Sequence, residues 1–472
     1  MSRPPLFGLG LQGKSSAVTA KKLTNVYLEF RPVGEKVQIC AFGTAGLDLF
    51  SDAFGDTPHR GPPLSFETLQ VFYTVHRGTL WEVNNAAVRT NRGTLLTSTG
   101  TVSMAHNGTQ VCVVDGTYGY IYNTSTFAFT QIVAAGFPSK PQTVTFQDGY
   151  FIVNKGLTGQ FNISSLYDGM AWSALDSAVA ESNPDNLIKV ISDHGQLVLF
   201  GDLTTEFWSN TISLTFPYAR MQLANVEWGL AAQNSVVKFD NSLAFLAANR
   251  MGQYQVVRLN GFQPQRISNS DMENTINGYA TASDATGLSY LQDGHPFYQL
   301  NFPAAGYSWL FDGSTAEWTS LKSANITRHR GNYATNYLGQ TIVTDYSNGR
   351  LYKLNSAAYT DNGDMLEREI IGEHWDDPDL ARVPINSIRL DMETGVGLVS
   401  GQGSNPQIML QASKDRGRTW GTERWKSCGK IGEYLTTVEW NRWGMSRNWT
   451  FKLRLTDPVK FVVLGAITNY RD

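Results

Sequence analysis

The sequence predicts an all-β protein: a β-propeller of six or seven blades, followed by a C-terminal β-sandwich domain, with an N-terminal arm. Three observations lead to this fold class. A two-part unit of turn and strand recurs along the middle of the chain, its two parts keep a nearly constant offset, and the later strands alternate apolar and polar residues. We place the arm at residues 1–60, the propeller at 61–356 and the sandwich at 357–472.

The arm contains two segments of strand-like composition, NVYLEF and KVQICAF. Both are rich in the β-branched and aromatic residues that favour strands. Because no repeat pattern surrounds them, we expect an arm with one or two strands that packs on either domain.

Each copy of the repeat begins with a tight turn and an apolar strand. These first parts are HNGTQVCVV (106–114), QDGYFIV (147–153), DHGQLVLF (193–200), DNSLAFLA (240–247), QDGHPFYQL (292–300) and LGQTIVT (338–344). A second turn and an aromatic-led strand follow, in GYIYN, GQFNI, TEFWS, GQYQVV, GYSWLF and GRLYKLN. The Asx-Gly turns supply the positive φ that two-residue hairpins need. The apolar strands barely alternate, which suits burial on both faces between neighbouring blades.

The spacing of the two parts indicates a true repeat. Asn107 and Tyr120 are thirteen residues apart, as are Asp148 and Phe161. The copies lie roughly 39 to 53 residues apart, close to the length of a four-stranded propeller blade. A seventh, incomplete copy opens the series, because GTLWEVN from Gly78 matches GRLYKLN in the last copy. Hairpins in a sandwich are the alternative, but a sandwich seldom keeps one spacing through six copies.

The pattern changes after Asn355, where AAYTDNGDMLERE marks the joint to a separate C-terminal domain. The segments SIRLDM (387–392), QIMLQA (407–412) and NWTFKLRL (448–455) place apolar residues on one face and polar residues on the other. This alternation predicts a β-sandwich with one buried face in each sheet.

Composition excludes several classes of protein. With 38 basic and 41 acidic residues the net charge is −3, so any contact with DNA is expected to be weak or purely geometric. Cys40, Cys112 and Cys428 lie far apart without CxxC spacing, which disfavours a disulfide framework and a zinc site and favours folding in a reducing cytoplasm. No signal peptide and no apolar run of membrane-spanning length are visible, so we expect no membrane association.

One segment matches a nucleotide-binding pattern. GLGLQGKS (Gly8 to Ser15) satisfies G-x-x-x-x-G-K-[ST]. That loop holds phosphates only where it follows a buried strand and opens a helix. Here two prolines precede it and SSAVTAKKL is a poor helix start. We expect no nucleotide and no other cofactor.

A second segment matches the Asp-box hairpin of sialidase-like propellers and other β proteins. SKDRGRTW fits S-x-D-x-G-x-T-W, and its matching residues are Ser413, Asp415, Gly417, Thr419 and Trp420. We expect the Asp415 carboxylate to accept bonds from turn amides, Gly417 to take positive φ and the Trp420 ring to be buried. A sialidase would need several boxes, an arginine cluster and a tyrosine with a carboxylate. The single box therefore predicts a structural hairpin.

A third segment, GEHWDDPD (Gly372 to Asp379), clusters four carboxylates and a histidine. Calcium takes oxygen ligands from such loops, but EF-hand spacing is absent, so we favour a solvated loop and predict no metal. The seven histidines form no HExxH pair and no GxSxG elbow occurs. His106 and His194 stand beside the repeat turns, where a turn role is expected. No catalytic residue is predicted, and we expect the protein not to be an enzyme.

Three segments together resemble a known family. They are SMAHNGTQVCVVDGTYGYIYN from Ser103, the C-terminal block from Ser413 to Ala466, and NVYLEFRPVGEK followed by TAGLDLF. These resemble the packaged-DNA stabilisation proteins of short-tailed bacteriophages, also called tail accessory factors, tail hubs or nozzles. Ala45 stands where a proline is frequent in the family, so the N-terminal segment departs from the pattern. The likeness is strongest over the last 60 residues.

The resemblance implies a virion protein without enzyme activity. It implies a homo-oligomer, a hexameric ring beneath the head-to-tail adaptor, that continues the DNA channel and retains the packaged double-stranded DNA without sequence-specific binding. Tailspikes and a tail needle or plug would dock on it. The expected location is the virion tail, after assembly in the host cytoplasm.

Two other functions stay open from the sequence. A glycan-binding or sialidase-like propeller is the first alternative, as the Asp box suggests, and a screen for glycan binding or sialidase turnover separates it from a virion protein. A cellular propeller scaffold is the second. A neighbouring portal, adaptor or tailspike gene would exclude that scaffold.

Overall fold

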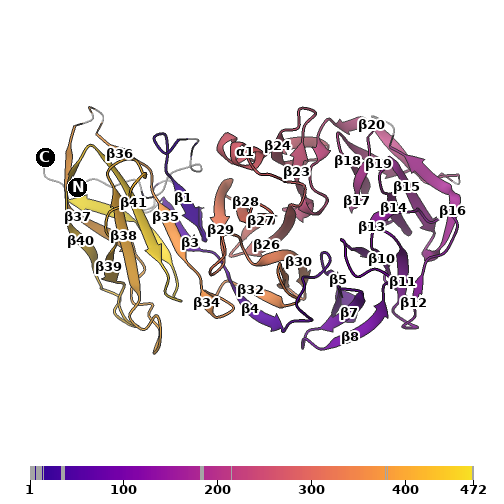
Figure 1. Ribbon diagram of the computed structural model, residues 1–472, viewed down its shortest axis with the longest axis horizontal. Helices are drawn as coiled ribbons and strands as arrows, with labels where there is room; N and C mark the ends of the chain where they lie inside the picture. Colours follow the sequence, from indigo (N-terminus) through magenta and orange to yellow (C-terminus); the bar gives the residue numbers. More distant parts are fainter. Residues whose placement is uncertain are drawn as a thin grey trace.

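The computed structural model describes residues 6, 13, 15–32, 34, 38–180, 185–213, 215–377, 379 and 381–469. A ring of small sheets lies at the right of Figure 1 and a sandwich of two larger sheets lies at the left. Within the described residues, strands are interrupted by a single α-helix, α1 (Ser270–Asn277), and two 3₁₀ turns, η1 (Glu67–Leu69) and η2 (Gln233–Ser235). The prediction of an all-β propeller followed by a sandwich is confirmed.

The ring consists of seven sheets in the described residues, which we number as blades 1 to 7. Blade 1 is β5 (Leu64–Phe66), β6 (Val71–His76), β7 (Thr79–Asn84) and β8 (Arg89–Thr94). Blade 2 is β9 (Ser103–His106), β10 (Gln110–Val114), β11 (Gly119–Asn123) and β12 (Phe129–Gln131). Blade 3 is β13 (Pro141–Gln147), β14 (Tyr150–Lys155), β15 (Gln160–Ser165) and β16 (Asp168–Val179). Blade 4 is β17 (Leu187–Asp193), β18 (Gln196–Gly201), β19 (Thr205–Asn210) and β20 (Tyr218–Val226).

The remaining blades depart slightly from this scheme. Blade 5 is β21 (Gly229–Leu230), β22 (Val237–Phe239), β23 (Ser242–Ala248), β24 (Tyr254–Asn260) and β25 (Gln263–Arg266). Blade 6 is β26 (Thr286–Gln292), β27 (His295–Phe302), β28 (Tyr307–Asp312) and β29 (Glu317–Leu321). Blade 7 is β30 (Gly331–Tyr337), β31 (Gln340–Asp345) and β32 (Leu351–Asn355), to which β4 (Gly46–Ser51) adds from the N-terminal side.

The repeat found in the sequence forms the middle of each blade. Its apolar parts are β10, β14, β18, β23, β27 and β31, and its aromatic-led parts are β11, β15, β19, β24, β28 and β32. The preceding turns take positive φ, for instance 52° at Asp148 and 90° at Gly149. The middle strands are buried because the next blade covers them: the rings of Phe200 and Phe245, in blades 4 and 5, lie 4.9 Å apart.

The copy at Gly78, expected to be incomplete, is a full blade. The apolar strand of this copy, β6, is buried along its whole length, but the turn before it is η1. There Gln70 takes the positive φ of 53°. The repeat was hidden because this turn carries no Asx-Gly pair.

The ring closes through a strand that lies far from blade 7 in sequence. β4 pairs antiparallel with β32, where Leu47 is opposite Leu354 and Leu49 is opposite Tyr352. A short hairpin, β33 (Thr360–Asp361) with β34 (Asp364–Met365), continues the sheet beyond β4. The first and last segments of the propeller thus share one blade.

The sandwich consists of two sheets around one core. The first contains β1 (Lys22–Thr24), β35 (Arg368–Ile371), β41 (Asn448–Leu455), β38 (Gln407–Ser413) and β39 (Arg424–Ser427), with β36 (Trp375–Asp376) beside β41. The second contains β2 (Val26–Phe30), β3 (Ile39–Gly43), β42 (Val462–Asn469), β37 (Val383–Met392) and β40 (Val438–Ser446). Trp440 and Trp449 are among the largest side chains of the core between them.

Propeller and sandwich share a sheet. β1 pairs with β29 of blade 6 on one side and with β35 on the other, which gives a ten-stranded sheet. The buried Asn25 fixes this junction: its Nδ2 donates to the carbonyls of Lys322 and Glu367, at 2.9 and 2.8 Å. The N-terminal residues expected to form an arm therefore divide, since β2 and β3 join the sandwich and β4 joins the propeller (Figure 1).

Candidate functional site

The Asp box forms a hydrogen-bonded turn after β38. The Asp415 carboxylate accepts bonds from the Thr419 amide at 2.8 Å and the Thr419 hydroxyl at 2.6 Å. The Ser413 hydroxyl donates to Asp415 at 2.7 Å and accepts from the Gly417 amide at 2.8 Å. These bonds, those from Thr419 first, lower the pKa of Asp415 to about 2. The turn lies in the sandwich, outside the seven blades.

Gly417 has the predicted positive φ, whereas Trp420 is less buried than predicted. Gly417 takes a φ of +77°, and a Cβ there would lie 2.6 Å from the Cβ of Ala20 in the N-terminal segment. The Trp420 ring, expected to be buried, is only half-buried. The Lys452 ammonium lies 4.5 Å from its centroid and covers it in place of a core. The hairpin therefore contacts the N-terminal segment through its glycine.

Three side chains of the acidic segment 372–379 have separate partners within the chain. The Glu373 carboxylate accepts a bond from Thr19 at 3.0 Å, and Asp376 pairs with Arg416 at 3.2 Å. His374 contacts the Thr450 hydroxyl through Nδ1. Over the described ranges, no group of three His, Cys, Asp or Glu side chains is arranged to hold a metal.

The phosphate-loop pattern at Gly8 to Ser15 lies outside the described residues except for Gly13 and Ser15. The three cysteines are buried. Burial raises the pKa of the Cys428 thiol to about 12 and also raises that of Cys112, so neither is a thiolate near neutral pH. Within the described residues, no helix is long and apolar enough to cross a membrane.

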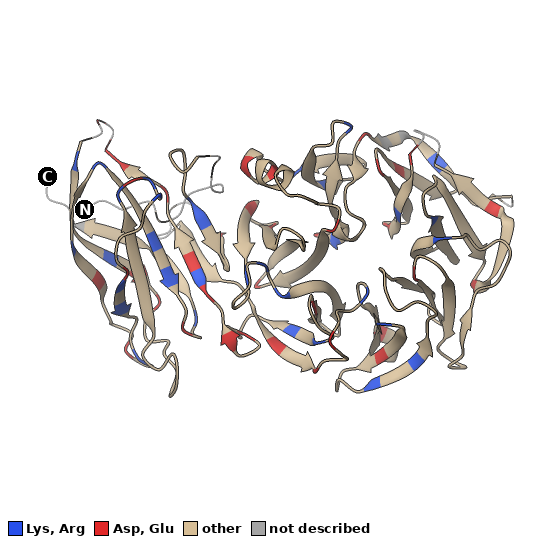
Figure 2. Ribbon diagram, in the orientation of Figure 1, with Lys and Arg blue, Asp and Glu red and all other residues tan. Residues whose placement is uncertain are grey.

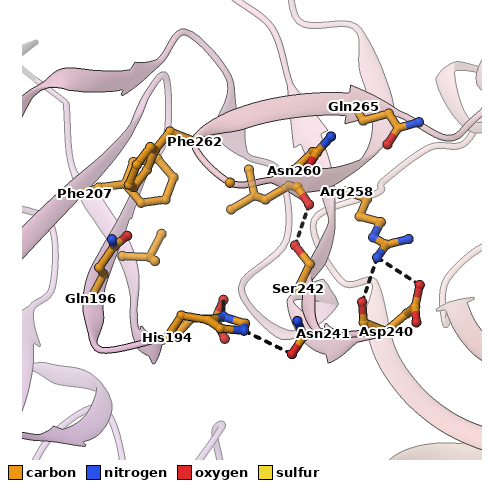
Figure 3. Close-up of a pocket in the computed structure, with 14 residues that line it drawn as sticks. His194, Gln196, Phe207, Asp240, Asn241, Ser242, Arg258, Asn260, Phe262 and Gln265 are labelled. Carbon is orange, nitrogen blue, oxygen red and sulfur yellow. Dashed lines mark hydrogen bonds and ion pairs between the residues drawn. The ribbon is translucent and has the colours of Figure 1, made fainter.

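A cleft of about 530 Å³ lies between blades 4 and 5 (Figure 3). Two charged pairs occupy its wall. The Arg258 guanidinium lies 2.9 Å from a carboxylate oxygen of Asp240, and the His194 Nδ1 lies 2.9 Å from Asp193. Each carboxylate therefore already has a basic side chain as partner, which does not resemble the paired acid and nucleophile of a glycosidase.

His194 also links the two blades. Its Nε2 lies 3.1 Å from Oδ1 of Asn241 in the next repeat turn (Figure 3). The bonds to Asp193 and then to Asn241 raise the pKa of His194. Its backbone has a φ of 47°, as the expected turn role requires. His106, expected in a turn, ends β9 instead and pairs with Val111.

A second cavity, which we call the central cavity, lies on the propeller axis and has a volume of about 610 Å³. The innermost part of each blade contributes to it. The lining residues include Leu64, Ser103, His106, Thr145, Lys189, Ser192, Asn234, Lys238, Ser289, Thr335 and Asn336. Sequence analysis did not identify this cavity as a site, because its residues belong to seven different copies of the repeat.

The turn η2 reaches across one end of the central cavity. Gln233 donates to the carbonyl of Gln142 in blade 3 at 3.5 Å, and Asn234 contacts the Tyr333 hydroxyl in blade 7 at 3.4 Å. Neither blade neighbours blade 5, so the two contacts span the axis. The Lys189 ammonium in blade 4 donates to the Gln233 carbonyl at 3.1 Å.

Charge is distributed over both parts of the chain. Figure 2 shows basic and acidic residues on the sandwich strands and on the blades, with both signs on each. Three basic side chains of the sandwich lie over tryptophan rings: Lys414 over Trp449, Arg424 over Trp443 and Lys452 over Trp420. In these contacts, aromatic rings of the same chain stabilise the three cations.

Fold and sites together define a class: a propeller joined through a shared sheet to a β-sandwich. Residues 13–359 match the family described as "Bacteriophage P22 Gp10, beta-propeller", and residues 368–469 match "Bacteriophage P22 Gp10, beta-sandwich". The chain belongs to this bacteriophage P22 Gp10 family. The resemblance to phage tail proteins drawn from the sequence is thereby confirmed.

The individual proteins that resemble this chain have low sequence identity to it. "Tail hub protein gp10" of Salmonella phage P22 is 25% identical over 245 residues, which cover 48% of this chain and 51% of the relative. The chain thus matches about half the length of this curated relative. Among solved structures, one of the mitotic checkpoint complex is 14% identical with a TM-score of 0.46, covering 69% of this chain and 95% of that one. The Pan2 WD40 domain of Neurospora crassa is 9% identical with a TM-score of 0.44, covering 66% and 96%.

Proposed function

We propose that this chain is a structural tail hub protein of a short-tailed phage, and not an enzyme. Several copies form a ring, a hexamer by the family resemblance, below the head-to-tail adaptor. The ring extends the DNA channel, retains the packaged genome and provides docking surfaces for tailspikes and a tail needle or plug. The observation that carries this proposal is the family match, which covers both the propeller and the sandwich.

The geometry of the propeller supports a channel built from several copies. The central cavity has the volume of a small-molecule site, and η2 reaches across one end of it. Double-stranded DNA therefore does not pass along the axis of one propeller. A channel for DNA has to lie between subunits, as in a closed ring formed by heterologous contacts.

The junction of propeller and sandwich supports a role in which the subunit resists mechanical force. A short linker would leave two domains free to move against each other. Here a ten-stranded sheet continues from blade 6 into the sandwich, and β4 anchors the N-terminal side in blade 7. Two connections at different places favour one rigid subunit, which suits a wall under pressure from packaged DNA.

Two measurements test the proposal. Cryo-electron microscopy of purified particles should show the chain as a ring between head and tail fibres or spikes, and native mass spectrometry gives its copy number. Particles made without the chain should fill with DNA and then lose it. Absence of the chain from purified particles would refute a virion role. Heads that never fill would move the protein to packaging, and specific glycan binding or sialidase turnover by the purified chain would favour the glycan alternative.

A further inference from the structure

The central cavity has an uneven charge. Among its lining residues are two lysines, Lys189 and Lys238, and one histidine, His106, but no aspartate or glutamate. The other polar lining groups are hydroxyls and carboxamides. Acidic residues outnumber basic ones in the whole chain, by 41 to 38, so a cavity with lysines and without carboxylates departs from the average surface.

Lys189 is a partly buried cation of the central cavity. Its ammonium donates to two backbone carbonyls of the η2 region, those of Gln233 at 3.1 Å and Val236 at 3.4 Å. In the part of the chain that the structure describes, no ion pair of Lys189 with a carboxylate is found. Burial alone lowers the pKa of this group to about 8. A charge removed from water without a counter-ion is unfavourable, and a bound anion would offset that cost.

Two other lining residues of the cavity strengthen the preference for an anion. Lys238 is exposed, so its charge adds to the field of Lys189 without a desolvation penalty of similar size. The Nδ1 of His106 is buried and makes no hydrogen bond within the described residues. Burial lowers the pKa of His106 and so favours the neutral ring, in which Nδ1 carries the proton in one tautomer.

We propose that the central cavity binds a small phosphate-bearing anion, with Lys189 and Lys238 as its charged contacts. The volume of about 610 Å³ is sufficient for an inorganic polyphosphate or a nucleotide. Because residues from all seven blades line the cavity, the site exists only in the closed ring. It stabilises the closed propeller by binding the folded state. This inference concerns the interior of one subunit and is independent of the proposed function.

The test uses the full chain and isothermal titration calorimetry at constant ionic strength. Pyrophosphate is the first ligand, and sodium chloride at matched ionic strength is the blank. Lys189→Gln should weaken pyrophosphate binding about tenfold or more, the loss expected for one charge-assisted contact. Lys189→Arg should retain most of the binding. Lys430→Gln, an exposed lysine in the sandwich, is the matched control and should bind like the native chain.

A second variant and two further ligands complete the test. If Lys189→Gln does not fold, the exposed Lys238→Gln takes its place and should also weaken binding. Adenosine triphosphate and inorganic phosphate, titrated separately, distinguish a nucleotide from a bare oxyanion. Equal binding by the native chain, Lys189→Gln and Lys238→Gln would overturn the proposal, and so would the absence of heat with every phosphate compound.

Discussion

At the scale of single residues, Asp415 shows how a sequence motif becomes a stability determinant. Its carboxylate receives both the amide and the hydroxyl of Thr419, together with the Ser413 hydroxyl. All three bonds favour the ionised form, which is why the pKa of Asp415 falls to about 2. A carboxylate with a pKa lower in the folded than in the unfolded chain stabilises the fold above the unfolded value of about 3.9.

We predict that Asp415→Ala lowers the melting temperature at pH 7. The contribution of Asp415 is lost as pH falls through its folded pKa of about 2, so the difference between variant and native chain should shrink in strong acid. Scanning calorimetry at several pH values measures it. The exposed Glu67→Ala is the control and should melt like the native chain. An unchanged melting temperature together with lost glycan binding would show that the box is a binding site.

We predict that the His194 ring titrates above its usual pKa near 6.5. A raised folded pKa means that the link to Asp193 and Asn241 stabilises the fold below the unfolded value and is lost as pH rises through the folded one. Asn241→Ala removes one acceptor and should lower the pKa of His194 toward 6.5. NMR titration, with His194→Gln used to assign the resonance, measures both. Asn260→Ala, in the same cleft, should have no effect, and an unshifted His194 pKa in the native chain would contradict the prediction.

Residue-level prediction from the sequence succeeded where the cause was local. The positive φ at Asp148 and Gly149 follows from their identities, since a two-residue hairpin requires it. The expected burial of Trp420 failed because Lys452, from a different strand, determines what covers the ring. Lys189 was missed because a missing counter-ion is a property of neighbours from several blades and leaves no pattern in one sequence.

At the scale of elements, β4 depends on two leucines with different surroundings. Leu47 is 1% exposed and Leu49 is 49% exposed, although both pair with β32. We predict that Leu47→Ala lowers the free energy of unfolding by about 2 to 5 kcal/mol, because it leaves a cavity in the closing blade. Leu49→Ala is the matched control and should change it by less than about 0.5 kcal/mol. Urea unfolding measures both, and equal effects would show that the burial of Leu47 does not stabilise the closing blade.

β4 also shows which strand pairings could not be predicted from the sequence. The middle strands of most blades are visible because a tight turn precedes the apolar strand and a short loop leads from it to the aromatic-led strand. β4 and β1 pair with strands about 300 residues away, so their partners depend on the closed ring and on the sandwich, which no local pattern contains. The sequence therefore predicted strands in the N-terminal arm, but it did not predict which sheets those strands join.

At the scale of the whole molecule, a nearly balanced charge suits a wall past which DNA slides. Each phosphate neutralised by a lysine or arginine adds affinity through counter-ion release. We predict that the purified chain binds duplex DNA no more tightly than the ~10⁻⁴ to 10⁻⁶ M of non-specific binding at physiological salt. Fluorescence anisotropy over a salt series measures this. Tight binding with a steep salt dependence would contradict this prediction, because it would show that the purified chain binds DNA through its charge.

The pairing of β4 with β32 also has a consequence for synthesis on the ribosome. β4 ends at Ser51, whereas its partner β32 begins at Leu351. The sequence separation between β3 and its partner β42 is larger still. At roughly 5 to 20 residues per second, the strand edges of β4 stay without their partner for on the order of 15 to 60 s. Unpaired edges recruit other chains. Nascent copies translated close together on one messenger RNA are therefore exposed to exchange of this strand, in which the β4 of one copy closes the seventh blade of another.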